Sequence, residues 1–272
     1  MAGFSSSTTG EDAVMRGDQA AADRAGCFHP DLVSNVPEPA QKYLLHTIDP
    51  GTPLASRIEM EMSGHIRLSP AGKWMPFHAR QEMSREGFVW KASAGRLLWI
   101  GGEDRYLDGE GAMRWKLWGL IPVVNAAGPN ITRAARGRFL AEAAVWLPGL
   151  LLPEQGTSWR RVDGETAEAT IEITGAPFPL TFSIGPDGAL QKVVFRRWGN
   201  VGTDNGRWTE IPFGVTFSGE TKFGGYTMPT RLMASWWIGT DQQFDFFEAE
   251  ITSAKFGEDR GQSLTQGLSH QA

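Results

Sequence analysis

The 272-residue sequence predicts a mainly β (α+β) fold: a strongly curved antiparallel sheet, or half-barrel, with one helix packed on its concave side and short N-terminal helices. Several long segments alternate apolar and polar residues with a period of two, which is typical of half-buried strands. Short turns rich in glycine and proline separate them, and such turns join antiparallel neighbours. Residues 131–147 instead repeat their apolar residues with the spacing of an amphipathic helix.

Polar segments lie at both ends of the chain. We expect residues 1–30 to be a flexible tail, residues 31–256 to form one domain with a possible subdivision near residue 153, and residues 257–272 to be a second tail. Residues 37–47 begin with prolines and carry a small apolar face, so they are expected to form a short helix.

Residues 55–68 give the clearest strand pattern, because apolar residues such as Ile58 and Met60 alternate with Glu59 and Glu61. The segment 108–111, Asp-Gly-Glu-Gly, predicts a hairpin turn between two strands. Further strands are expected at residues 73–83, 87–92, 96–100, 105–107, 113–118, 166–173, 180–184, 190–198, 211–218, 221–223, 229–238 and 243–256.

The helix expected at residues 131–147 follows Asn130, a residue type that often caps a helix, and ends at a Pro-Gly pair. Arg138 and Glu142 are spaced to form an ion pair one turn apart. Trp146 continues nearly the same side of the helix. If that side faces a cavity, the charged pair could anchor a polar group or move a proton; otherwise it is a surface ion pair.

Charge and composition exclude several classes of function. The formal net charge is -5, whereas a nucleic-acid-binding protein usually concentrates positive charge. The basic pair Arg196 and Arg197 is isolated and is expected to lie on a solvated strand face. With one cysteine, no export signal and no apolar run long enough to span a membrane, we expect a cytoplasmic protein without an integral membrane segment.

Metal and cofactor motifs are missing from the sequence. The five histidines have no zinc-ligand spacing, although His65 and His78 are expected in adjacent strands. The glycine-rich stretches follow no nucleotide-binding spacing, and there is no GxSxG elbow of a hydrolase. We therefore expect neither a metal ion nor a cofactor.

Eleven tryptophans are the most informative feature for function. Trp115 and Trp118 are expected on opposite faces of one strand, as are Trp236 and Trp237, so both faces would require apolar cover. Core packing supplies such cover, and so does a cavity for an apolar ligand. The residues expected to contact a ligand are Trp74, Trp90, Trp115, Trp146, Tyr106 and Arg138.

A catalytic role for the same cavity remains open at the level of the sequence. Arg138 would hold an anion, while Glu142, Asp108 or His78 would move a proton. Asp108 lies in the predicted hairpin turn, where acidic residues more often serve as solvent-facing turn formers.

Several short motifs follow one another along the chain: Trp74–Gln81, Phe88–Trp90, Tyr106–Gly111, Arg138–Glu142, Phe223–Gly225 and Pro229–Thr230. In order and spacing they resemble a bacterial family of uncharacterised proteins, the DUF6544 or DUF6920-like group, over about residues 37–256. This family brings no assigned activity. The curved sheet with helical cover is also similar to the lipoprotein-carrier (LolA/LolB-like) fold, and that resemblance implies a concavity for acyl chains or other apolar molecules.

Three functions follow from these observations. The first is binding of an apolar small molecule or lipid in an aromatic-lined cavity. The second is a cofactor-independent enzyme that acts on an apolar or aromatic metabolite in the same cavity. The third is a structural or partner-binding β domain in which all the aromatic residues belong to the core.

Overall fold

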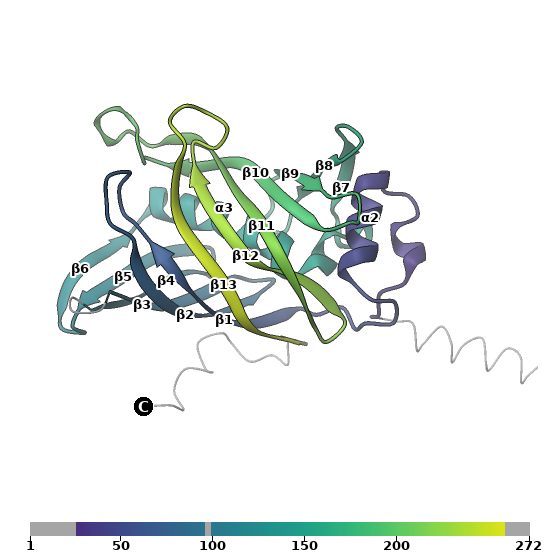
Figure 1. Cartoon of the computed structure of the whole chain (residues 1–272), viewed down its shortest axis with the longest axis horizontal. Coiled ribbons are helices and arrows are strands. Elements are labelled where there is room, and N and C mark those ends of the chain that lie inside the picture. Colours follow the sequence, from purple (N-terminus) through teal and green to yellow (C-terminus); the bar gives the residue numbers. More distant parts are fainter. Residues whose placement is uncertain (1–25, 96–98, 259–272) are drawn as a thin grey trace, which may run out of the picture.

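The computed structural model describes residues 26–95 and 99–258, in which thirteen strands form one antiparallel sheet (Figure 1). The first six strands are β1 (Arg57–Ile66), β2 (Met75–Ser84), β3 (Phe88–Ala94), β4 (Ile100–Leu107), β5 (Glu110–Leu117) and β6 (Ile121–Ala127). The other seven are β7 (Ser158–Arg161), β8 (Thr166–Ile171), β9 (Phe178–Ile184), β10 (Leu190–Gly199), β11 (Thr209–Phe223), β12 (Tyr226–Trp236) and β13 (Phe244–Gly257).

The order of strands across the sheet is β6-β5-β4-β3-β2-β1-β13-β12-β11-β10-β9-β8-β7. Each half is therefore a meander of sequential neighbours, and the first and last strands pair at the centre. The edge strands β6 and β7 do not pair with each other, so the sheet stays open. The chain passes from one edge to the other through helix α3 (Pro129–Trp146).

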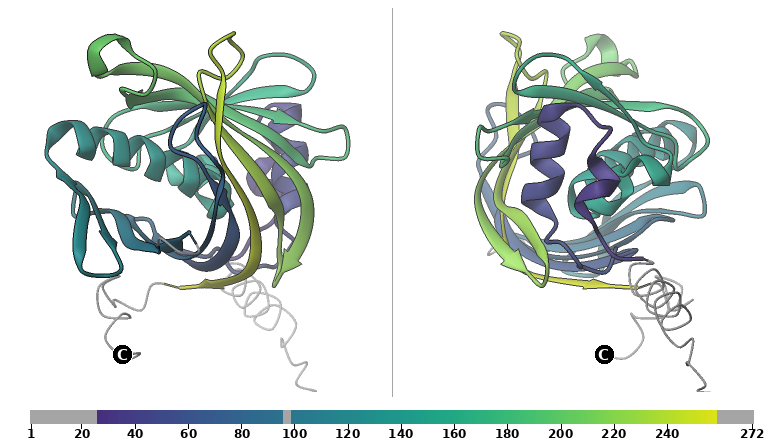
Figure 2. Two further views of the ribbon diagram at one scale, coloured as in Figure 1. Left: turned by 60° about the vertical axis from the view of Figure 1, so that its left-hand side comes forward. Right: turned by 90° about the vertical axis from the view of Figure 1, so that its right-hand side faces the viewer.

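Bulges bend the sheet into its curved shape. The pairing register shifts between Glu61 and Met62 in β1, and between Ala234 and Ser235 in β12. It also shifts at Trp115 in β5. An extra residue on one strand of a pair bends that strand and increases its twist. These bulges lie in both halves, and the whole sheet curves around one side (Figure 2).

Helix α3 lies on the concave side of the sheet, as the sequence predicts (Figure 2). Its fully buried residues include Phe139, Leu140 and Ala143, each with no exposed surface. Gly111 in β5 allows a close approach, because a Cβ there would lie 2.7 Å from the Cβ of Ala135 in α3. A second helix, α2 (Glu38–Thr47), also packs inside the sheet, where the ring of Tyr43 lies 5.6 Å from that of Phe182 in β9. Short 3-10 turns at Pro30–Val33, Pro148–Leu151, Pro153–Gln155 and Asp204–Gly206 complete the elements.

The predicted hairpin at Asp108 is confirmed. Asp108 and Gly109 have φ angles of 52° and 78°, and together they join β4 to β5. Positive φ at both central residues is the requirement of the tight turn whose twist matches that of the strands.

The predicted cap of α3 is wrong. The cap position is Gly128, with a φ of 102°, and Asn130 lies inside the first turn. The Asn130 side chain instead accepts a hydrogen bond from the indole nitrogen of Trp198, at 3.0 Å. It therefore joins the start of α3 to β10 rather than closing the helix end.

The prediction that Trp118 and Trp237 continue their strands is also wrong. Both residues have left-handed backbone conformations, with φ angles of 50° and 56°, and both follow the last residue of a strand. Each turns the chain out of the sheet. Alternation of residue types cannot reveal this, because the backbone angle at a strand end depends on the turn that follows.

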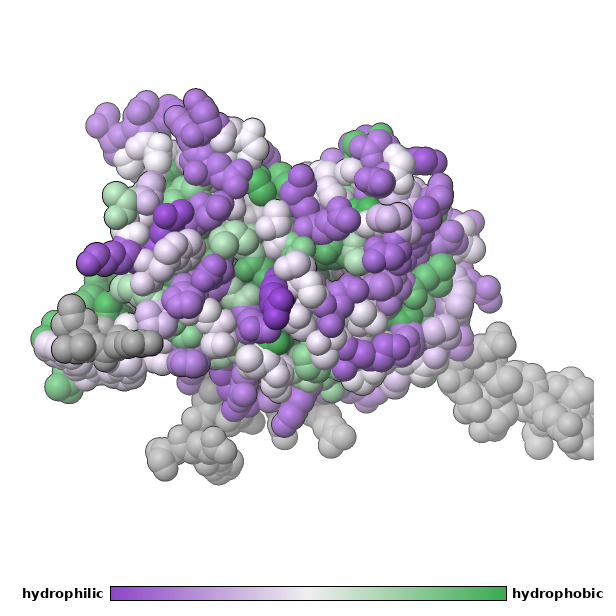
Figure 3. All heavy atoms as spheres, in the orientation of Figure 1, coloured by the Kyte–Doolittle hydropathy of each residue, from purple (hydrophilic) through white to green (hydrophobic). Residues whose placement is uncertain are grey.

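Strand β6 was not expected from the sequence. It is the edge of the sheet, and most of its residues are exposed on both faces, so its sequence shows no alternation. Figure 3 shows apolar surface at this end of the molecule, where Leu120 is 81% exposed and Ile121 is 52% exposed. In contrast, the separate strands expected at 211–218 and 221–223 are one strand, β11.

The boundary expected at residue 30, between the N-terminal tail and the domain, lies too late in the chain. Residues 1–25 lie outside the described part of the chain, but Phe28 is fully buried and its backbone N–H donates to the carbonyl of Thr52 at 2.8 Å. Residues 26–30 thus pack against the sheet and helices. At the other end, Gly257 still pairs with Arg57 in the sheet, while residues 259–272 are not described.

Candidate functional site

A cavity of about 510 Å³ lies between α3 and the concave face of the sheet. Most of its lining is aliphatic or aromatic, and the side chains come from both halves of the sheet and from one side of the helix. Leu68 belongs to this lining and is 77% exposed, so the cavity reaches the surface beside the loop that follows β1.

Two rows of inward-facing residues build the walls. In the second half of the sheet, Val193, Val215, Ala234 and Phe247 are successive partners across β10, β11, β12 and β13, and all four line the cavity. Because partners in a row share one face of the sheet, their side chains form a continuous apolar surface.

The row in the first half of the sheet is mixed in character. Gln81, Trp90, Asp104 and Met113 are successive partners across β2, β3, β4 and β5, and all four line the cavity. Two polar side chains therefore face the same space as an indole ring and a thioether.

Arg138 of α3 connects these polar side chains. Its Nε donates to Glu142 at 2.6 Å, and its Nη1 donates to Asp104 at 3.1 Å. Glu142 also accepts a hydrogen bond from Gln81 at 2.5 Å, and Asp104 accepts one from the indole of Trp115 at 2.8 Å. Both carboxylates on this wall thus have a cation and a second donor.

Burial governs the ionisation of this group. Burial raises the pKa of Asp104 above its ordinary value of 3.8, in opposition to Arg138 and Trp115, which lower it. Burial alone would lower the pKa of Arg138, but the attraction of Glu142 and Asp104 outweighs that effect and leaves its pKa above the usual value. Arg138 is therefore a fixed cation between two carboxylates.

Arg197 of β10 lines the cavity in a different way. Its guanidinium carbon lies 4.6 Å from the ring centre of Phe213 and 4.9 Å from that of Trp236. Its Nε is buried and has no hydrogen-bond partner among the described residues, and no carboxylate in that part of the chain lies within 4.0 Å of it. Burial, and then repulsion by Arg138, lower the pKa of Arg197 to about 10, so it is charged at neutral pH.

Four of the residues singled out from the sequence line the cavity: Trp90, Trp146, Arg138 and Glu142. Trp90 packs 5.7 Å from the ring of Trp115, and Trp146 meets Phe217 edge-on at 6.2 Å. Both rings are thus part of a larger aromatic wall, which also holds the rings of Phe246 and Phe247.

The other three predicted contact residues are not among the lining residues. Trp74 is 37% exposed and lies under the guanidinium of Arg67, 4.7 Å from its ring centre. Trp115 packs beside Trp90, and its indole N–H donates to Asp104. Tyr106 is buried and stacks on Phe139 at 5.3 Å. The sequence pattern marked these rings as half-buried, but a core and a cavity wall have the same pattern.

Two predicted catalytic candidates lie away from the cavity. Asp108 is exposed in the turn between β4 and β5. His78 is exposed on the outer face of β2, because its neighbour Phe77 points inward and is 1% exposed. His65 pairs with Glu248 at 2.8 Å and lies opposite Pro76 rather than His78. Because neighbouring residues of a strand face opposite sides of the sheet, Phe77 points inward and His78 points outward.

Arg197 and Asp104 are the functional candidates that the sequence interpretation missed. Arg197 was expected on a solvated face, yet it follows Val193 and Phe195 at a spacing of two, and those residues are buried. The periodic pattern therefore contained its position. Asp104 had no comparable signal, since its role depends on pairing between β3, β4 and α3.

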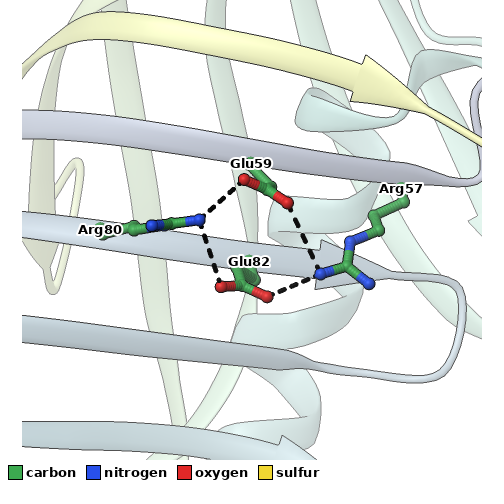
Figure 4. Close-up of polar contacts among 4 residues, drawn as sticks. All are labelled: Arg57, Glu59, Arg80 and Glu82. Atoms are coloured by element: carbon green, nitrogen blue, oxygen red, sulfur yellow. Dashed lines mark hydrogen bonds and ion pairs between the residues drawn. The ribbon is translucent and has the colours of Figure 1, made fainter. Parts of the chain in front are cut away.

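The outer face of the sheet carries a separate group of charges. Glu59 and Glu82 lie opposite each other on β1 and β2, and Arg57 and Arg80 bridge them in an alternating ring (Figure 4). The shortest contact joins Arg57 to Glu82 at 2.7 Å. This ring offsets the like-charge pair and stabilises the central strands, and it does not reach the cavity.

Neither a metal site nor a membrane span is found in the described residues. In residues 26–95 and 99–258, no three His, Cys, Asp or Glu side chains are grouped so that they could hold a metal ion. Across the same ranges, no helix has both the length and the apolar character needed to cross a bilayer.

Comparison with known proteins assigns the chain to a family. Residues 26–249 match the model of a family of unknown function, DUF6544, and the chain belongs to that family. No curated protein matches the sequence.

Two solved structures resemble the fold. A LolA superfamily protein from Nitrosomonas europaea has a TM-score of 0.45 and 9% identity, over 80% of this chain and 92% of that chain. A DUF1329 family protein from Desulfovibrio piger has a TM-score of 0.38 and 12% identity, over 77% of this chain and 88% of that chain. The resemblance to the DUF6544 family that the motifs indicate is confirmed, and a LolA superfamily protein is among the structural neighbours.

Proposed function

We propose that this protein binds an apolar small molecule or lipid in the cavity between α3 and the sheet. The observation that carries the proposal is the cavity itself: its volume of about 510 Å³ lies within the roughly 300–1,000 Å³ of ligand pockets. Protein interiors are otherwise close-packed, with few voids larger than a water molecule. An aromatic and aliphatic lining around such a space favours an apolar occupant.

Titration with the neutral fluorescent probe N-phenylnaphthylamine tests this proposal. We expect saturable fluorescence enhancement with the full chain, because the probe exchanges water for an aromatic and aliphatic lining. Native mass spectrometry of the purified protein is expected to show a co-purified apolar molecule. Absence of saturable enhancement would contradict the proposal.

A matched pair of substitutions locates the binding. Val145 faces the cavity from α3, whereas Val162 is 48% exposed in the turn after β7. Val145→Phe places a ring in the cavity and is expected to weaken probe binding about tenfold or more, since apolar ligands cannot share occupied space. Val162→Phe adds the same ring outside and should leave the affinity unchanged. Equal effects of the two variants would place the probe elsewhere.

Catalysis on an apolar metabolite in the same cavity is a second candidate. The observation that favours it is the pair of carboxylates, Asp104 and Glu142, on the cavity wall, together with the raised pKa of Asp104. Both carboxylates are already engaged by Arg138, which favours binding over proton transfer. Glu142→Gln is expected to abolish product formation if this candidate is correct, and turnover that survives the change would contradict it.

A further inference from the structure

Arg197 is a charged side chain with no carboxylate at ion-pair distance among the described residues, and Glu142 and Asp104 attract it only from farther away. Two aromatic rings pack against its guanidinium, and its buried Nε has no hydrogen-bond partner in the described ranges. Burying a cation without a hydrogen-bonded partner is costly, so such a group in a cavity wall indicates a ligand that completes it.

The carboxylates of the opposite wall do not fill this role. Arg138 engages both of them, at 3.1 Å to Asp104 and 2.6 Å to Glu142. Trp115 and Gln81 occupy their remaining oxygens. Each carboxylate oxygen of this wall therefore already accepts a hydrogen bond within the protein, while the guanidinium of Arg197 has no direct acceptor for its buried Nε among the described residues.

We infer that the ligand is an anionic amphiphile whose head group is a single carboxylate, bound by Arg197, with its apolar part in the aromatic cavity. This inference rests on the proposed binding function. A guanidinium presents parallel N–H groups that match the two oxygens of a carboxylate. Phe213 and Trp236 pack edge-to-face with their ring centres 4.9 Å apart, so both rings lie on the same side of the guanidinium and support it from there.

The charge of the cavity favours a monoanion over a phosphate. Asp104 and Glu142 line the same space, and a doubly charged group would be repelled by both more strongly than a carboxylate. Arg138 and Arg197 supply two positive charges against these two carboxylates, so the space has no excess positive charge with which to hold a dianion.

Displacement of N-phenylnaphthylamine by ligands with one chain and different head groups tests this inference. Decanoate is expected to displace the probe at a concentration about tenfold lower than decanol, as expected for one charge-assisted interaction. Decylamine is expected to bind worse than decanol. Decyl phosphate is expected to bind less tightly than decanoate; tighter binding would overturn the carboxylate assignment.

Adjacent arginines provide the matched control. Arg197→Met is expected to remove the preference for decanoate while leaving decanol affinity unchanged, and Arg197→Lys to retain part of the preference. Arg196 points outward from the same strand and donates to the carbonyl of Glu210, so Arg196→Gln should keep the full preference. A decanoate preference that survives Arg197→Met would overturn the inference.

Failure of the inference differs from failure of the proposed function. If the probe and decanol bind the full chain but decanoate gains nothing, the head-group assignment is wrong and apolar binding stands. If none of the compounds binds, both are wrong. Circular dichroism and urea unfolding of each variant establish that it is folded, and Arg197→Gln serves as a second variant if Arg197→Met does not fold.

Discussion

The cavity places two arginines in contrasting environments. Arg138, on α3, has a carboxylate on each side, and its hydrogen bonds join the helix to β2 and β4 through Gln81, Asp104 and Glu142. Arg197, on β10, has two aromatic rings and no carboxylate within ion-pair distance in the described residues. The first wall is complete within the protein and fixes the helix on the sheet. The second wall leaves the buried Nε of Arg197 without a hydrogen-bond partner in the described residues, and the inference assigns that place to an external anion.

The largest expected effect is the difference in unfolding free energy between a variant that lacks Arg138 and a variant that lacks Arg197. Arg138→Met leaves two carboxylates without their counter-ion, and we expect the free energy of unfolding to fall by about 3 kcal/mol. We take a loss at the lower end of the range for buried ion pairs because the three side chains are not fully buried: each is still 16–26% exposed. Arg197→Met removes a charge without a partner and should change stability by less than about 1 kcal/mol.

Urea unfolding of both variants measures this difference. Lys42→Met is the control for losing a cation at the surface. Lys42 pairs with Glu38, and both side chains are about half exposed, so this variant should leave the free energy of unfolding unchanged. Equal losses for Arg138→Met and Arg197→Met would contradict the distinction between a saturated and an unsaturated wall.

Neutralising Asp104, Arg138 and Glu142 together should lower the free energy of unfolding less than removing Arg138 alone. The triple variant Asp104→Asn, Arg138→Met and Glu142→Gln leaves no charge on these three positions, so it should be more stable than Arg138→Met by about 2 kcal/mol. Thermal and urea unfolding of the two variants provide the comparison. If the triple variant is the less stable of the two, hydrogen bonds rather than charge dominate this wall.

The pH dependence of stability gives the smallest expected effect. Because burial raises the pKa of Asp104 in the folded protein above its ordinary 3.8, the folded state binds the proton more tightly than the unfolded chain. The contribution of Asp104 to stability is therefore greatest below the unfolded pKa and is lost as the pH rises through the folded value.

Asp104→Asn removes this titration. Between about pH 4 and pH 7, the stability of the unmodified protein should fall relative to that of Asp104→Asn. Unfolding free energies at several pH values measure the slope. A slope of the opposite sign would mean that the attraction of Arg138 and Trp115 exceeds the effect of burial.

Local sequence patterns determined much of this protein. A period of two predicted most of the strands. The same period places Arg197 on the inner face of β10, two residues after Phe195, although we had expected it on a solvated face. The Asp-Gly pair gave the β4–β5 hairpin because both residues tolerate positive φ, and the apolar spacing of residues 131–147 gave α3. The exposed edge β6 escaped prediction because neither of its faces is buried and it therefore has no period.

Only the tertiary structure decided what each face meets. Alternation shows that Trp90 and Trp115 are covered, but long-range pairing places Trp90 at the cavity and Trp115 beside it, outside the lining. The group of Asp104, Arg138 and Gln81 forms because β2, β4 and α3 come together, and no local pattern encodes that meeting. The sequence thus determined which side chains point inward. The tertiary structure decided that Arg138 makes direct ion pairs and that Arg197 makes none in the described residues, since an ion pair requires two distant segments to lie within a few ångströms.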